Sequence, residues 1–90
     1  MALLNPTQGE RAAQAPASNA FAITPNDSTI FAQYTRAIYI GGDGDIAVRL
    51  ANMETSHVDF VGVKGGTVLP IRARMVRATN TTATNIVGLY

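Results

Sequence analysis

The sequence predicts a small all-β fold, a β-sandwich or barrel of about six short antiparallel strands with an extended N-terminal arm. Three observations support this fold class. Short apolar runs recur at intervals of roughly 8–12 residues, stretches rich in Gly, Pro, Asn and Asp separate them, and no segment keeps a helical period. The chain of 90 residues is long enough for one domain. We place that β-domain at residues 20–90 and the arm at residues 1–19.

Each predicted strand is a run of apolar, β-branched or aromatic residues between turn-forming residues. One run shows the alternation of a half-buried strand especially clearly. In it, Ile46, Val48 and Leu50 are expected to face the core, whereas Ala47 and Arg49 are expected to face outward. The predicted strands are residues 20–24, 35–40, 45–50, 58–63, 67–78 and 85–90.

Two glycine-rich connections are predicted to be the tight turns of β-hairpins. Residues 41–44 read Gly-Gly-Asp-Gly and residues 64–66 read Lys-Gly-Gly. Glycine and aspartate tolerate the positive φ angles that such turns require. Pro70 lies inside the longest predicted strand and cannot donate a hydrogen bond to a neighbouring strand. It therefore indicates an edge strand, a strand start or a bulge.

The composition indicates a domain that depends on protein neighbours. The chain has no cysteine and one histidine, so disulfides and an ordinary Cys/His zinc site are excluded. Only 14% of the residues are charged and 47% are hydrophobic, which leaves too few charges to cover the large surface of a small domain. Small domains without staples often gain stability by oligomerisation. We therefore expect a homo-oligomer.

The same composition gives little support to other classes of partner. A net charge of +1 provides no general attraction to nucleic acid or to an anionic membrane. No apolar run approaches the roughly 20 residues of a membrane-spanning helix. The first residues lack the basic region of a signal peptide, so we expect synthesis and use in cytoplasm-like conditions.

No group of residues predicts catalysis, a cofactor or a metal. Residues 41–45 nearly match a calcium-binding glycine–aspartate repeat, but Ile46 stands at a ligand position and no second copy follows, so a turn is favoured. His57 and Asp59 are expected on the same strand face, whereas Ser56 points the opposite way. Acyl transfer needs a nucleophile beside such a pair. The chain is therefore not expected to be an enzyme.

The densest basic cluster consists of Arg72, Arg74 and Arg77. Arg72 and Arg74 share a strand face, and Arg77 joins them only if a bulge changes the alternation. Nucleic-acid binding would favour interleaved aromatic residues, which this segment lacks. We expect these arginines to pair with carboxylates; a solvated face and contact with a polyanion are the alternatives. The expected carboxylates are those of a neighbouring subunit or those of Asp43, Asp45, Glu54 and Asp59.

The predicted arm carries Pro6, Gly9 and Pro16 and has no sustained apolar period, so it cannot bury itself. A disordered tail is one interpretation. We favour an arm that lies across a neighbouring subunit, because such an arm suits a small, sparsely charged β-domain in a packed assembly. The predicted interface residues are Arg72, Arg74, Arg77, Leu3, Leu4 and Tyr90.

Four stretches, taken in order, resemble the spike-base family of tailed bacteriophages and gene transfer agents. The ordered set of stretches covers most of residues 20–90. The stretches are FAITPNDS at residues 21–28, TRAIYIGGDGD at residues 35–45, KGGTVLPIRAR at residues 64–74 and ATNTTATNIVGLY at residues 78–90.

This resemblance implies a virion structural protein, assembled in the cytoplasm of a host bacterium, without catalytic residues or cofactors. It implies a homo-oligomeric ring, with a pentamer as one option, that serves as a head spike base or decoration subunit and contacts a capsid, spike or fibre protein. Two alternatives stay open. One is a carbohydrate-binding β-sandwich module, and the other is a capsid cement protein between capsomers.

Overall fold

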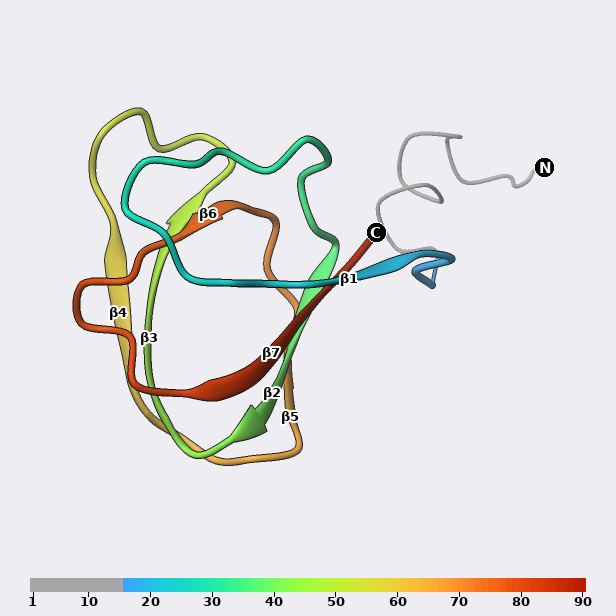
Figure 1. The fold of residues 1–90 in the computed structure, drawn as a ribbon. Coiled ribbons are helices and arrows are strands. Elements are labelled where there is room, and N and C mark those ends of the chain that lie inside the picture. The colour runs from blue at the N-terminus through green and yellow to red at the C-terminus, as the bar shows by residue number, and fades with distance from the viewer. Residues whose placement is uncertain (1–15) are drawn as a thin grey trace, which may run out of the picture.

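The computed structural model describes residues 16–90, which form two antiparallel β-sheets packed against each other (Figure 1). One sheet has four strands in the order β1-β7-β2-β5, and the other has three in the order β4-β3-β6. The predicted all-β class is confirmed, with seven strands in place of about six. The strands are β1 (Ala20–Ala22), β2 (Ala37–Gly42), β3 (Gly44–Leu50), β4 (Val58–Val63), β5 (Thr67–Leu69), β6 (Ala73–Val76) and β7 (Thr84–Leu89).

The core lies between the two sheets and follows from period-2 alternation on their facing sides. Ile38 and Ile40 on β2 are 0% exposed, as is Ile46 on β3. Burial of one such side chain stabilises the fold by about 1.5–3 kcal/mol. Within residues 16–90 no helix is long and apolar enough to cross a membrane. The core cluster comprises Ile23, Ile38, Ile40, Ile46, Val48, Ala73, Val76, Ala83 and Ile86.

The two glycine-rich connections turn the chain sharply, but they do not join paired strands. β2 passes into β3 at Asp43, and β4 passes into β5 at residues 64–66, and each passage leads from one sheet to the other. β3 pairs with β4, and β2 pairs with β5. The prediction of two hairpins was therefore wrong, because two long paired strands bend together over the edge of the sandwich. Figure 1 shows both corners at the same end of the molecule.

Glycine is required where these two corners touch. A Cβ on Gly65 would lie 2.6 Å from the carbonyl oxygen of Gly41, so a side chain at that position would push the corners apart. Gly66 has a φ of +86°, which side chains of L-residues disfavour. Its N–H donates to the carbonyl of Ile40 across the corner. The turn chemistry read from the sequence was right, and the strand pairing was not.

The predicted strand at residues 67–78 is divided at Pro70. β5 ends at Leu69 as an edge strand of the four-stranded sheet, and β6 begins at Ala73 in the other sheet. Between them, the N–H of Ile71 donates to the carbonyl of Leu69, which forms a tight turn around the proline. Pro70 thus marks a crossing between sheets, and a single continuous strand was an incorrect prediction.

The alternation predicted for β3 holds for Ile46 and Val48, but Ala47 is also fully buried. The segment after β6 stays beside β3 and forms hydrogen bonds with the backbone of Ala47. The N–H of Arg77 donates to the carbonyl of Ala47, and the N–H of Ala47 donates to the hydroxyl of Thr81. Contacts from a distant segment therefore bury a residue that the local pattern places outward.

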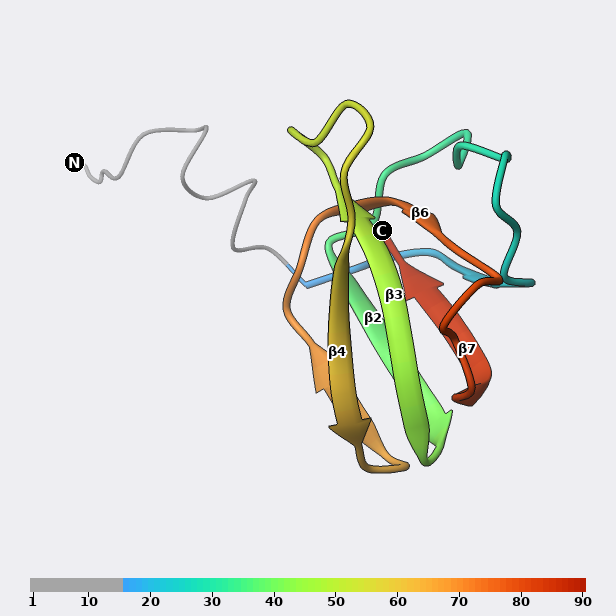
Figure 2. The same cartoon turned by 90° about the vertical axis from the view of Figure 1, so that its left-hand side faces the viewer.

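The long connection between β1 and β2 covers the free edge of β6. Its backbone N–H groups at Asn26, Phe31 and Thr35 donate to carbonyls of β6, from Val76 to Ala73. A covered edge cannot recruit a strand from another molecule. Figure 2 shows the three-stranded sheet in front of the strands β2 and β7 of the four-stranded sheet.

Candidate interface

Arg72 and Arg74 meet on the ring of Tyr34. The two guanidinium carbons lie 5.7 Å and 5.6 Å from the ring centroid, so both arginines make cation–π contacts with the same ring. The prediction that Arg72 and Arg74 share a face agrees with this geometry. Tyr34 belongs to the connection before β2, and no local sequence signal places it beside the arginines.

Arg74 fastens the loop between β3 and β4. Its Nη1 donates to the carbonyls of Met53 at 2.9 Å and Ala51 at 3.4 Å. Its Nε is buried and has no hydrogen-bond partner among residues 16–90. Arg74 therefore stabilises the fold of this domain. Arg72 is exposed, so its guanidinium is accessible to another molecule.

A mainly apolar hollow of about 540 Å³ opens beside Arg72. A surface with an apolar floor and an arginine on its rim has the composition that protein interfaces favour. The hollow is lined by Leu50, Ala51, Asn52, Met53, Pro70, Ile71 and Arg72.

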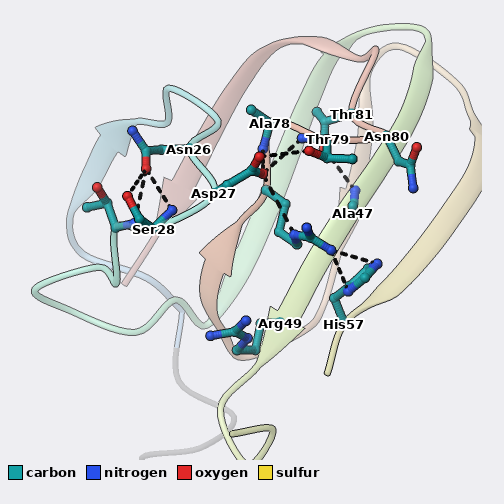
Figure 3. A network of polar contacts seen from close by, with 12 residues as sticks. Asn26, Asp27, Ser28, Ala47, Arg49, His57, Ala78, Thr79, Asn80 and Thr81 are labelled. Carbon is teal, nitrogen blue, oxygen red and sulfur yellow. Dashed lines mark hydrogen bonds and ion pairs between the residues drawn. The ribbon is translucent and has the colours of Figure 1, made fainter. Parts of the chain in front are cut away.

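Arg77 belongs to a separate polar network, in which its side chain lies between those of Asp27 and His57, which Figure 3 labels. Its Nε lies 3.7 Å from a carboxylate oxygen of Asp27, and its Nη1 lies 2.7 Å from Nδ1 of His57. His57 in turn lies 3.7 Å from Asp59, which agrees with the prediction that this pair shares a face. Arginine can only donate, so the ring nitrogen that faces it accepts the hydrogen bond. Among residues 16–90 the arginine cluster makes no ion pair with the predicted carboxylates, and the one carboxylate partner of the cluster is Asp27.

Asp27 holds the turn that follows β6. Its Oδ1 accepts from the N–H groups of Ala78 at 2.8 Å and Thr79 at 2.9 Å, and its Oδ2 accepts from the hydroxyl of Thr79 at 2.7 Å. The hydrogen bonds from Thr79 lower the pKa of Asp27 below its ordinary value, with smaller help from Ala78 and from the charge of Arg77. In the sequence, Asp27 stands in a run of turn-forming residues between two predicted strands, and nothing there singles it out.

The two aspartates of the glycine-rich corner also have structural partners. Asp43 accepts from the N–H of Gly65 at 2.6 Å, and Asp45 accepts from the N–H of Gly62 at 2.9 Å. Both carboxylates thus brace the crossing between the sheets. In the part of the chain that the structure describes, no three His, Asp or Glu side chains gather where they could hold a metal ion.

Tyr90 packs on the body of the domain. Its ring lies edge-on to Phe21 with centroids 5.7 Å apart, and its backbone exchanges hydrogen bonds with Asn19. The same carbonyl also accepts from the N–H of Ser18, so the chain enters β1 against its own C-terminal residue. Leu3 and Leu4, the other predicted contact residues near a terminus, lie outside the described residues.

The comparisons with known proteins find a strong similarity among the solved structures. No family model matches the sequence, and no curated protein matches it significantly. Among solved structures, the chain is similar to a chain in a structure described as the capsid of the native gene transfer agent (GTA) particle computed with C5 symmetry. The two share 36% sequence identity with a TM-score of 0.77, and the match covers 87% of this chain and 88% of that chain. The chain therefore belongs to the same family as this chain of the gene transfer agent capsid.

Proposed function

We propose that the chain is a structural subunit of a phage-like particle and has no catalytic role. The observation that carries this proposal is the similarity to a chain of a gene transfer agent capsid over nearly the full length of both chains. The described residues fit such a role, because their polar side chains brace the fold. Asp27, Asp43 and Asp45 each accept a hydrogen bond from backbone N–H groups.

The finer proposal is a homo-oligomeric ring that serves as a spike base or decoration subunit on the particle. The similar capsid was computed with C5 symmetry, which makes a five-membered ring the arrangement to test first. Cyclic rings join two different surfaces of each subunit. On this proposal, Arg72 and the hollow beside it contribute one of those surfaces.

The two alternatives differ in what the surface should offer. A carbohydrate-binding module uses exposed aromatic rings as platforms, and Tyr39, at 38%, is the large aromatic residue most exposed among residues 16–90. One partly exposed ring gives this alternative little support. A capsid cement protein would share the packing chemistry proposed here and would differ in its position on the particle.

The test is the protein content of particles purified from the organism that encodes the chain. We expect mass spectrometry to find the chain in these particles, and microscopy of particles with a tagged copy to show density at a fixed position. Density at the vertices would support the spike-base role, whereas density between capsomers would favour cement. If purified particles lacked the chain, the proposed function would be wrong.

A further inference from the structure

The four-stranded sheet presents an apolar surface on the side away from the core. The residues of these strands that point toward the core include Ile38 and Ile86, which are buried, and Phe21, which packs on Gly88. Because side chains alternate along a strand, the residues between them point outward on all four strands. None of the outward side chains on these strands is charged. We define the outer apolar face as Ala20, Ala22, Ala37, Tyr39, Val68, Val87 and Leu89.

One row of this face runs without interruption across the sheet. Ala22 on β1 pairs with Val87 on β7, which pairs with Tyr39 on β2. Tyr39 then pairs with Val68 on β5. Tyr39 is 38% exposed and Val68 is 50% exposed. An uncharged row this long on the surface of a small domain is typical of a contact surface.

The outer side of the three-stranded sheet is different. It carries the polar network of Arg77, His57 and Asp59, and Arg49 there donates to the carbonyls of Thr55 and Ser56. The charged side chains on that side have hydrogen-bond or ion-pair partners within the domain and favour water. The two outer sides of the sandwich thus differ in polarity, and the apolar one lacks a cover among the described residues.

The size of the outer apolar face decides what kind of partner fits it. The face consists of four strands about 4.8 Å apart, with about three rows of outward side chains across them, so its area is roughly 300 Å². A stable contact between two folded bodies buries about 800 Å² on each partner. The face is too small for such a contact alone. It matches one extended segment of about five or six residues, which spans about 20 Å.

The chain itself supplies such a segment. Residues 1–15 precede the described structure, and the stretch from Met1 to Gln8 has no charged side chain and includes Leu3 and Leu4. The chain joins the sheet at its edge, where Ser18 and Asn19 bond to Tyr90 at the end of β7. Fifteen residues can extend about 50 Å, which is enough to reach another subunit.

We propose that the outer apolar face binds the N-terminal segment, residues 1–15, of a neighbouring copy of this chain. Leu3 and Leu4 would pack on the row that contains Tyr39 and Val68. The inference rests on the proposed function only in that a neighbouring copy must be present. It adds the surface on which the copies are joined.

The absence of cysteine allows a direct test with the full-length chain. Leu4→Cys is prepared in one batch, and Val68→Cys in another, and the two are mixed under oxidising conditions. We expect a disulfide-linked pair of chains, since a bridge forms only when the two Cα atoms come within about 7 Å. The matched control is Val61→Cys, because Val61 is even more exposed, at 77%, but lies on β4 of the other sheet.

A second experiment introduces a charge into the outer apolar face. Tyr39→Lys, combined with Val68→Cys, is expected to reduce the linked product with Leu4→Cys at least fivefold, while thermal unfolding shows that the domain remains folded. Equal linkage to Val61→Cys and Val68→Cys would overturn the proposal. So would a Leu4→Cys/Val68→Cys double variant that forms only a bridge within one chain. Absence of the chain from particles would contradict the proposed function and leave the linkage result unchanged.

Discussion

The N–H of Ala73 donates to the buried hydroxyl of Thr35 at 3.0 Å, and the N–H of Thr35 donates back to the carbonyl of Ala73 at 3.1 Å. The hydroxyl also donates to the carbonyl of Ile71 at 3.0 Å. Thr35 is 0% exposed. Thr35 therefore makes the hydrogen bonds that a neighbouring strand would make at the start of β6. These bonds connect β6 to the segment before β2.

Thr35→Val should destabilise the domain by about 1–3 kcal/mol, because the N–H of Ala73 and the carbonyl of Ile71 each lose a partner while the shape is kept. Chemical denaturation of the full-length chain measures this change. Thr24→Val is the control, since Thr24 is exposed, and its effect should stay within about 0.5 kcal/mol. Equal stability of the two variants would contradict the role given to Thr35.

Asp27 should make the stability of the domain depend on pH in the acidic range. Hydrogen bonds to the folded carboxylate lower its pKa below the ordinary value of 3.8, so folding favours the ionised form. The contribution is complete above the unfolded-state pKa and is lost as the pH falls through the lower folded-state pKa. We expect the thermal midpoint of the natural chain to fall as the pH is lowered from above 3.8 to below it.

Asp27→Asn should flatten that fall, because the amide does not titrate. The control is Glu54→Gln, which removes an exposed carboxyl without changing the turn after β6. The curve of the Glu54→Gln variant should keep the shape of the natural one. Identical curves for the natural chain and Asp27→Asn would show that other carboxyls govern the acid response.

Arg72 and Arg74 should affect different properties, although both lie on Tyr34. Arg74→Ala removes donors from the carbonyls of Met53 and Ala51, and the loss of its unpartnered buried Nε offsets part of that cost. A net destabilisation of about 1–2 kcal/mol is expected. Arg72→Ala should change the unfolding free energy by at most about 0.5–1 kcal/mol, because it removes only one cation–π contact at an exposed site.

Assembly should respond in the opposite order. Arg72→Glu reverses a charge on the rim of the proposed contact surface and should reduce incorporation into particles, with the thermal midpoint nearly unchanged. Quantitative mass spectrometry of purified particles and thermal unfolding of the free chain provide the two readouts. Normal incorporation of Arg72→Glu would remove Arg72 from the proposed contact.

The elements that the sequence predicted well are those that local alternation determines. Ile38 and Ile40 were expected in a strand and lie fully in the core. The cation–π contacts of Tyr34 and the burial of Ala47 were not predicted, because both arise where segments distant in the chain meet. The crossing at Pro70 is of the same kind, since the local pattern indicates an interruption but not which sheet receives β6.

One feature of the sequence does indicate the outer apolar face. In residues 35–40, Ala37 and Tyr39 are apolar although they alternate with the core residues Ile38 and Ile40. A strand that is apolar on both sides is expected to be covered on both. What the sequence could not show is that β1, β7 and β5 present similar residues beside them, since that depends on strand order.

Gly88→Ala should destabilise the domain, because a Cβ at that position would lie 2.7 Å from two ring carbons of Phe21. The ring is held in turn by edge-on contacts with Phe31 and Tyr90, at 5.1 Å and 5.7 Å between centroids, so it cannot move aside without disturbing both. Overpacking of this kind costs about 1–3 kcal/mol. Phe21→Leu should restore part of the loss in the double variant, because the smaller side chain makes room for the methyl group. A double-mutant cycle in chemical denaturation measures this coupling, and strictly additive effects would show that the ring does not limit residue 88.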